Sequence, residues 1–203
     1  MVLWGYPKTT FGLASNDPEV ETQARRTFRT WSSDSKDKAD FVWRLECEEG
    51  SYRLTPPGNY QALDSEFELP HGVYSDLDTA VLNVEFQAVA VLVGRREAPL
   101  HMHGALLSQG GQCLALVGGK ECGKSTLSTY LWTRGWQLLS DDGFLFEEGL
   151  KVRPVPRRVR LREGARDLLP GPYSGQLPEH RQFEQRQDGT VLFQPVFPEE
   201  RRV

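Results

Sequence analysis

The sequence predicts an α/β fold over residues 99–203, preceded by a smaller α+β region over residues 1–98. Three observations support this prediction. Cys113–Val117 is a short apolar run typical of a strand, and a glycine-rich segment follows it. Ser125–Arg134 is compatible with a helix, and Trp136–Ser140 then has the pattern of another strand. Strand, loop, helix and strand therefore follow one another in the order of an α/β unit.

Composition limits the classes of function. The chain has 203 residues, a formal net charge of −4 and three cysteines. An acidic balance argues against general nucleic-acid binding. Apolar runs such as Ala88–Val93 are much shorter than a membrane span, and Met1–Gly5 does not begin a secretory signal, so we expect a cytoplasmic protein without a membrane segment. Cys47, Cys113 and Cys122 cannot all pair, and we expect reduced thiols.

For residues 1–98 the sequence predicts a helix and a hairpin, and it leaves open whether a further apolar segment is a helix or a strand. Asn16–Arg29 has the spacing of an amphipathic helix, and Phe41–Glu46 alternates like a strand, with Ser51–Leu54 as its hairpin partner. Between them, the polar stretch Trp31–Asp40 is expected to be a surface loop. Leu77–Val93 is mostly apolar and predicts a buried helix, a strand, or both, because its periodicity does not distinguish them.

The second region predicts a hairpin followed by a helix with a defined end. Gly104–Ser108 and Gln112–Val117 are apolar runs separated by Gln109, Gly110 and Gly111, which favours a tight turn. Gly135 is a suitable C-terminal stop for the helix. Further strands are expected at Phe144–Phe146, Val159–Leu161 and Val191–Phe193.

The glycine-rich segment matches the phosphate-binding P-loop pattern in full. Its glycines allow backbone N–H groups to converge on phosphate oxygens, and the following helix adds its N-terminal dipole. Lys124 would reach the outer phosphates, and Ser125 would bind magnesium. The alternative is a chance glycine-rich turn, and Thr126 could act only as a local cap. The predicted contacts are Gly118, Gly119, Lys120, Glu121, Cys122, Gly123, Lys124, Ser125 and Thr126.

Two adjacent carboxylates, Asp141 and Asp142, follow the strand after the P-loop helix. They could hold a metal ion and accept a proton from a hydroxyl substrate, the two tasks that phosphoryl transfer requires beyond positioning. Without the P-loop upstream, an acidic turn or helix cap would be the better interpretation. His101 and His103 have the alternating spacing of metal ligands, but no further Cys or His completes a transition-metal site.

The stretch from His103 to Gly143 resembles the core of the HPr kinase/phosphorylase family and its smaller relatives. The shared order is His-Gly before a hairpin, a P-loop, a helix ending at an Arg-Gly turn, and a strand ending in Asp-Asp. The resemblance implies a P-loop kinase core similar to phosphoenolpyruvate carboxykinase, using a nucleotide and magnesium to phosphorylate a serine hydroxyl. It implies that Asp141 is the base, that Asp142 holds metal or water, and that His103 lies near both.

This chain also departs from the family. Lys120, Glu121 and Cys122 stand where the family has smaller residues, and the C-terminal part is short. A looser similarity covers roughly the hundred residues from Pro99 and includes the run from Pro154 to Arg162. Four basic residues there either assist the reaction or form a solvated basic segment: Arg157, Arg158, Arg160 and Arg162.

The expected function is transfer of the γ-phosphoryl group of ATP or GTP, with Mg²⁺, to a hydroxyl of a peptide, protein or small molecule. Catalysis would rest on Asp141, Asp142, His103 and Lys124, with Ser125 and Asp142 at the metal. A nonenzymatic nucleotide-binding regulatory module and a small-molecule hydroxyl kinase are the alternatives. Assembly into a homo-oligomer is also open, and no residue specifies the acceptor.

Overall fold

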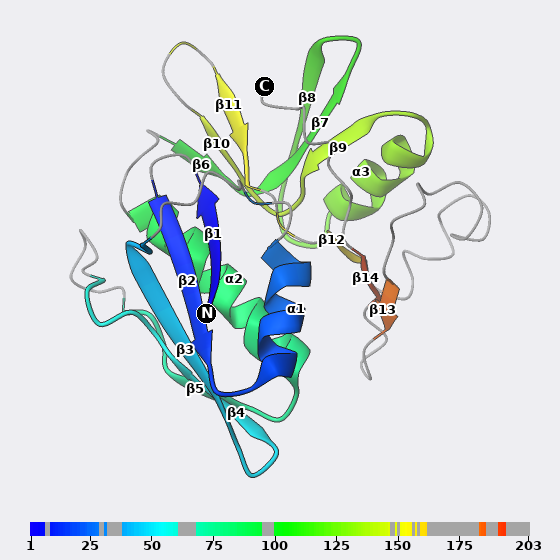
Figure 1. Cartoon of the computed structure of the whole chain (residues 1–203). Coiled ribbons are helices and arrows are strands. Elements are labelled where there is room, and N and C mark those ends of the chain that lie inside the picture. The colour runs from blue at the N-terminus through cyan, green and yellow to red at the C-terminus, as the bar shows by residue number, and fades with distance from the viewer. Residues whose placement is uncertain are drawn as a thin grey trace. The chain divides into compact units, whose positions relative to one another are not determined.

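The chain divides into two compact units, Met1–Glu97 and Ala98–Val203. A computed structural model (Figure 1) describes residues 1–6, 9–28, 31, 38–60, 68–94, 100–146, 149, 151–155, 157, 159–161, 183–185 and 191–193. Each unit contains both helices and strands, so the protein is a mixed α/β structure. The two units are described separately below.

The first unit is built on a five-stranded sheet with the order β1-β2-β3-β4-β5. Neighbouring strands are antiparallel except β2 and β3, which are parallel and are connected through helix α1. Helix α2 follows β5. The elements are β1 (Val2–Tyr6), β2 (Thr9–Ser15), α1 (Pro18–Phe28), β3 (Phe41–Glu48), β4 (Ser51–Thr55), β5 (Gly72–Tyr74) and α2 (Leu77–Gly94).

Helix α1 confirms the amphipathic helix predicted from the sequence. Asp17 caps it, because its Oδ1 accepts a hydrogen bond of 2.8 Å from the backbone N–H of Glu19. Val20, Ala24 and Phe28 are buried at four-residue spacing. The predicted hairpin is also confirmed, since β3 and β4 pair antiparallel around a turn in which Glu49 and Gly50 have φ of 48° and 77°.

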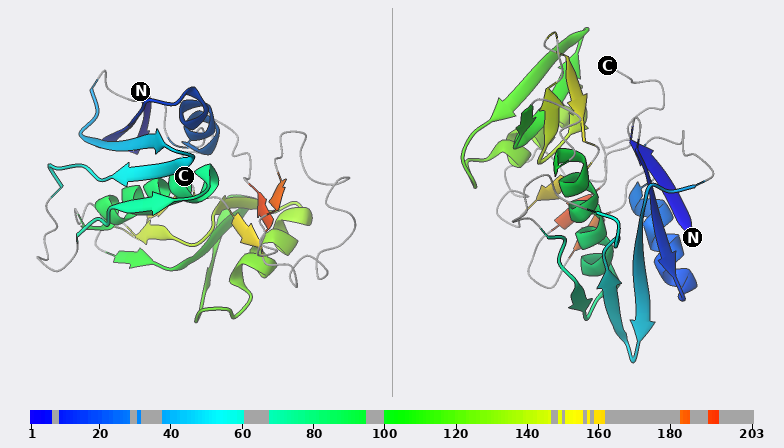
Figure 2. Two further views of the ribbon diagram at one scale, coloured as in Figure 1. Left: turned by 90° about the horizontal axis from the view of Figure 1, so that it is seen from below. Right: turned by 90° about the vertical axis from the view of Figure 1, so that its left-hand side faces the viewer.

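The apolar stretch that could have been a helix or a strand forms one helix, α2. Ten of its residues are buried, which explains why its sequence shows no polar stripe. α1 contacts α2, β1 and β2, and α2 contacts β4 and β5, so both helices cover one face of the sheet (Figure 2). Among the described residues α2 is long and apolar enough to cross a membrane, but 56% of it is buried, as in many soluble core helices.

An aromatic cluster fills the space between this sheet and α1. Trp4 stacks on Phe28 with ring centroids 4.0 Å apart, and Phe11 meets Trp31 edge to face at 5.9 Å. Trp43 lies beside Trp4 and Phe11 and donates a 2.8 Å hydrogen bond from Nε1 to Gln87 of α2. The cluster thus joins the sheet to both helices.

The second unit contains a small sheet of order β8-β7-β9 with helix α3 packed against it. The predicted hairpin is confirmed, because β7 and β8 pair antiparallel across Gly110 and Gly111, whose φ values are 58° and 81°. A left-handed conformation at both turn positions explains the two glycines. The elements are β7 (Gly104–Gln109), β8 (Gln112–Val117), α3 (Lys124–Thr133) and β9 (Gln137–Ser140).

Two further antiparallel sheets belong to this unit, with the orders β11-β10-β6 and β12-β14-β13. The expected strands at residues 144–146, 159–161 and 191–193 are all present. The elements are β6 (Leu100–Met102), β10 (Phe144–Phe146), β11 (Val152–Pro154), β12 (Val159–Leu161), β13 (Phe183–Gln185) and β14 (Val191–Phe193).

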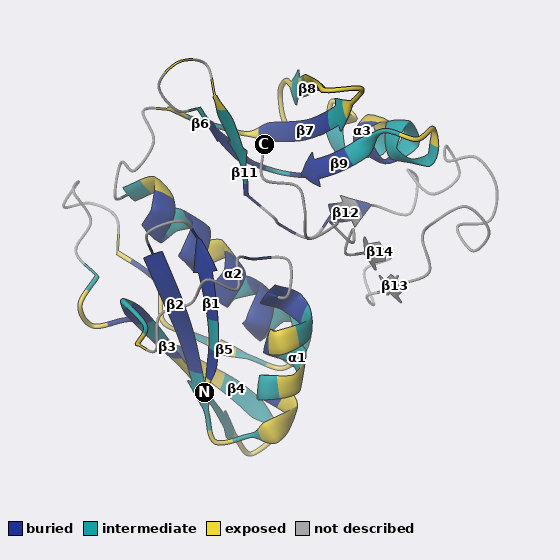
Figure 3. Ribbon diagram, turned by 45° about the horizontal axis from the view of Figure 1, so that its top comes forward, coloured by how far each residue is buried: buried dark blue, intermediate teal, exposed yellow. Residues whose placement is uncertain are grey.

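Strand β7 is buried on both faces (Figure 3). On one face Leu107 belongs to a buried cluster that Leu138 and β12 complete, and Tyr130 and Leu131 of α3 pack against it. On the other face Leu106 packs with Leu139 and Phe144. Strand β7 is therefore the buried central strand, with which β8 and β9 pair on either side.

Candidate functional site

The sheet topology brings three sequence-predicted segments to one edge. Strands β8 and β9 are both antiparallel to β7, so they run in the same direction with β7 between them. Gly104 at the start of β7 pairs with Val117 at the end of β8, and Leu106 pairs with Ser140 at the end of β9. Residue His103, the P-loop and the Asp-Asp turn therefore all leave the sheet at the same edge.

Gly104, which follows His103, is required by packing rather than by backbone conformation. A Cβ atom at this position would lie 2.5 Å from the main-chain oxygen of Leu116 and 3.1 Å from the ring of Phe144. A side chain there would push β8 away from β7, because the closer atom belongs to the backbone. The glycine of the His-Gly pair is therefore explained by packing of β7 against β8, whatever the chemical role of His103.

The P-loop connects β8 to α3 and is exposed along its length from Gly118 to Gly123. Glu121 and Gly123 have φ of 63° and 90°, so the loop turns through two left-handed positions before the helix begins. A Cβ at Gly118 would lie 2.8 Å from Cys122 Sγ, so a side chain there would require the exposed Cys122 side chain to move. The expected contacts Gly119 and Lys120 lie in the same exposed loop.

Lys124 lies over this loop. Its Nζ donates to the main-chain oxygens of Gly118 and Gly119 at 3.0 and 2.8 Å and lies 4.0 Å from Cys122 Sγ. An ammonium group has three N–H donors, and the third meets only the weak sulfur acceptor of Cys122, so a stronger acceptor could replace that contact. The cation is thus held at the mouth of the loop.

Helix α3 begins at Lys124 with Gly123 as its N-cap and without a side-chain cap. The N–H groups of its first turn and its dipole therefore favour an anion. Ser125 and Thr126 are partly buried in this turn. The helix ends at Thr133, before Gly135 as predicted. Gly135 has a φ of 93°, and the N–H of Trp136 donates a hydrogen bond of 3.1 Å to the main-chain oxygen of Leu131.

The two aspartates differ in accessibility. Asp141 is only 2% exposed, whereas the side chain of Asp142 is 39% exposed. Asp142 also has a φ of 68°, so its backbone makes the sharp turn between β9 and β10. Of the two carboxylates, that of Asp142 is the one a molecule in solution can reach.

Asp142 contacts both a histidine and an arginine. Nδ1 of His103 lies 3.1 Å from its Oδ1 and 3.2 Å from its main-chain oxygen. Both oxygens are acceptors, so these contacts require a proton on Nδ1. Nη1 of Arg157 donates to the other carboxylate oxygen, Oδ2. The structure therefore joins His103, Asp142 and Arg157 in one chain of interactions.

Arg157 is the residue of the basic run that the structure singles out. Its side chain is about 10% exposed, which is unusual for an arginine on a solvated basic segment. Arg158 and Arg162 lie outside the described residues, and of Arg160 only the backbone is described. In sequence Arg157 is indistinguishable from these neighbours, so only its contact with Asp142 identifies it.

His101 is half-buried in β6 and packs against the turn at Gly143, where a Cβ would lie 2.8 Å from its Nε2. Burial lowers the pKa of this imidazole, and the positive charges of His103 and Arg157 lower it further, whereas Asp142 opposes them. In the described part of the chain, no group of three or more His, Cys, Asp or Glu side chains could hold a metal ion. Cys47, Cys113 and Cys122 are free thiols.

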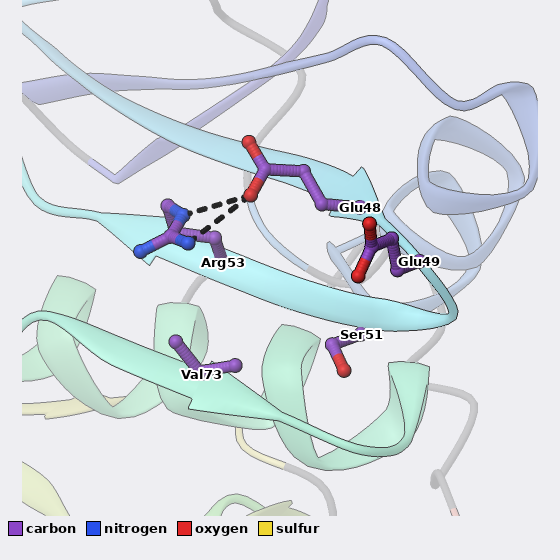
Figure 4. Close-up of a pocket in the computed structure, with 5 residues that line it drawn as sticks. All are labelled: Glu48, Glu49, Ser51, Arg53 and Val73. Atoms are coloured by element: carbon purple, nitrogen blue, oxygen red, sulfur yellow. Dashed lines mark hydrogen bonds and ion pairs between the residues drawn. The ribbon is translucent and has the colours of Figure 1, made fainter.

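A separate pocket lies in the first unit, at the β3–β4 hairpin (Figure 4). Arg53 crosses it and donates to Oε2 of Glu48 from Nε and Nη2 at 3.2 and 3.1 Å. Glu49, Ser51 and Val73 complete its lining. None of the catalytic, nucleotide-binding or metal-binding residues predicted from the sequence lines this pocket.

No known protein family, curated protein or solved structure matches the chain. The similarity to HPr kinase therefore stays a resemblance carried by the residues from His103 to Gly143.

Proposed function

We propose that the chain is a magnesium-dependent P-loop kinase that transfers the γ-phosphoryl group of ATP or GTP to a hydroxyl acceptor. One observation carries this proposal: the P-loop, His103 and the Asp-Asp turn leave the β8-β7-β9 sheet at one edge. Phosphoryl transfer requires a phosphate-binding loop and titratable groups in one region, and a shared edge of the sheet supports this.

The phosphate side consists of the loop amides, the first turn of α3 and Lys124. Loop N–H groups and the helix dipole would offset the charge of the phosphates. Lys124 already lies at the loop mouth and would exchange bonds with the carbonyls of Gly118 and Gly119 for bonds to phosphate oxygens.

The available donors fit magnesium rather than a transition metal. Magnesium prefers hydroxyl, carboxylate, water and phosphate oxygens and needs only one or two protein ligands. Ser125 in the first turn of α3 and the carboxylates at the end of β9 supply such oxygens. When bound, the ion would offset charge on the transferred phosphate. The Arg157 cation opposes a second cation on Asp142, so of the two expected ligands, Ser125 and Asp142, Ser125 fits the ion better.

Asp142 and His103 are better placed to accept the proton of the acceptor hydroxyl than Asp141, the base implied by the family resemblance. Burial keeps Asp141 from a hydroxyl in solution, whereas Asp142 and His103 have side chains that are 39% and 54% exposed. In the proposed reaction the acceptor oxygen bonds to the γ-phosphorus as the bond to the β-phosphate oxygen breaks. The hydroxyl proton goes to the Asp142–His103 pair, and the nucleoside diphosphate leaves.

Phosphate transfer to peptides tests this function. The protein is incubated with magnesium and γ-labelled ATP or GTP, with serine peptides, free serine or water as acceptor, and products are identified by mass. A label on a hydroxyl supports the kinase, and transfer only to free serine indicates a small-molecule kinase. Binding without transfer to any acceptor would instead identify a nonenzymatic nucleotide-binding module, and absence of binding would refute both.

A further inference from the structure

The carboxylate of Asp142 is bound by the guanidinium of Arg157, a residue outside the P-loop motif. Arg157 lies 15 residues further along the chain and donates to Oδ2, while Oδ1 faces Nδ1 of His103 at 3.1 Å. One carboxylate oxygen is therefore anchored and the other is directed to the imidazole. The guanidinium is much less exposed than either group it serves.

The backbone around Arg157 is tied to the turn that carries Asp142. The N–H of Arg157 donates to the oxygen of Val155 at 2.8 Å, and the N–H of Val155 lies 3.4 Å from the oxygen of Gly143. The buried hydroxyl of Ser140 contacts the main-chain oxygens of both Val155 and Gly143. These bonds fix the segment of Arg157 against the Asp-Asp turn.

We propose that Arg157 is a positioning residue for the proposed phosphoryl transfer. It holds Asp142 so that Oδ1 accepts the Nδ1 proton of His103, which fixes the imidazole ring and leaves the Nε2 lone pair free. This inference rests on the proposed function only for its effect on turnover. The positional link from Arg157 through Asp142 to His103 exists without a nucleotide.

A simple structural ion pair is the competing interpretation, because the Arg157–Asp142 contact would stabilise the turn whether or not it acts on His103. Such a pair would not determine which nitrogen of His103 carries the proton. A positioning residue would, because Oδ1 is one of the two acceptors that favour the Nδ1–H form, and a freely rotating carboxylate leaves only the main-chain oxygen of Asp142. The tautomer of His103 therefore separates the two interpretations.

The first experiment measures the ¹⁵N chemical shifts of His103 without nucleotide, at a pH of about 8.5, where an ordinary imidazole is neutral. The wild type should show Nδ1–H. Arg157→Gln and Asp142→Asn should both move toward the Nε2–H form, and Arg157→Lys should lie between because it keeps the charge but not the planar fork. Arg134→Gln, which removes a cation packed on Tyr130, is the matched control and should resemble the wild type.

The second experiment measures transfer kinetics in the same variants. Arg157→Gln should lower kcat about tenfold or more while the nucleotide KM stays within about twofold, because a misdirected group slows the reaction without touching the P-loop. In the Asp142→Asn background the same change should have no further effect.

Several results would overturn the inference: a His103 tautomer in Arg157→Gln equal to that of wild type, a raised nucleotide KM, or additive decreases in kcat in the double variant. If Arg157→Gln does not fold, a wild-type tautomer in Arg157→Lys refutes it. A shifted tautomer in a protein that transfers no phosphate would support the positioning link and remove the kinase proposal.

Discussion

The P-loop and the Asp-Asp turn lie at the same edge of one sheet, yet they are held in different ways. Lys124 bonds to Gly118 and Gly119, five or six residues away in sequence. Asp142 is held by His103 and Arg157, which are 39 and 15 residues away. The difference teaches that the loop is held by contacts within a local segment, whereas the Asp-Asp turn is held by contacts between distant segments. In the proposed kinase, phosphate binding would depend on the first and the acceptor side on the second. Binding and turnover should therefore be separable by mutation.

Lys124→Ala should have the largest effect, because it removes the cation at the mouth of the loop. We expect Mg–ATP affinity to fall about 100-fold or more, the scale expected when a charge-assisted hydrogen bond is removed from a partly desolvated site. Calorimetry with ATP and with GTP measures the change, and circular dichroism checks the fold. Unchanged affinity in a folded variant would show that the loop does not bind phosphate.

Asp142→Asn should separate nucleotide binding from phosphoryl transfer. Nucleotide affinity should stay close to that of the wild type, while phosphoryl transfer falls about 100-fold, the usual scale for a positioned acid or base. Asp141→Asn is the matched comparison at the buried carboxylate and should retain phosphoryl transfer close to that of the wild type. If Asp141→Asn abolished transfer at saturating magnesium and Asp142→Asn did not, the role implied by the family resemblance would be restored.

Gly104→Ala tests the sheet that brings the two sides together. A Cβ placed 2.5 Å from the oxygen of Leu116 forces β8 from β7, and overpacking of this kind costs about 1–3 kcal/mol. Chemical denaturation measures the decrease in unfolding free energy. Gly58→Ala, at a glycine where a Cβ would meet no atom within 4 Å, is the control and should change stability little. Equal decreases in both variants would contradict the packing explanation.

The smallest expected effect is a pH dependence that involves His101. Burial lowers the pKa of His101 below its ordinary value of 6.5, so folding favours the neutral ring. A lowered folded-state pKa stabilises the protein above the unfolded pKa, and this contribution is lost as pH falls through the window below 6.5. Thermal unfolding from pH 8 to 5 should therefore show a smaller acid-side decrease in stability in His101→Gln. A slope identical to that of wild type would exclude this contribution.

Much of the secondary structure was predictable because its causes are local. Gly110 and Gly111 occupy left-handed turn positions, and Gly135 ends a helix in the same conformation, so each glycine marked a boundary that the structure confirms. The helix over residues 18–28 followed from apolar spacing. By contrast, residues 77–94 had no distinguishing periodicity, because a helix covered on most sides needs no polar face.

Two features of the site depended on tertiary structure. The adjacent aspartates looked equivalent in sequence, but the turn with φ of 68° at Asp142 exposes one carboxylate, while Asp141 stays at 2% exposure. Arg157 looked like the other arginines of its run until the bonds around Ser140 placed it against Asp142. Burial and pairing between distant segments have no fixed spacing, so no pattern along the chain expresses them.

The sequence by itself determined the order of strand, loop, helix and strand, the glycine-rich pattern from Gly118 to Ser125, and the positions of the turns. These properties depend on backbone conformations and hydrogen bonds between residues a few positions apart. Only the tertiary structure decided that β7 separates β8 from β9, and that both of these strands end at the edge of the sheet where His103 precedes β7. It also decided that Arg157 holds Asp142. Those outcomes arise from burying β7 on both faces, which brings together side chains that are distant in sequence.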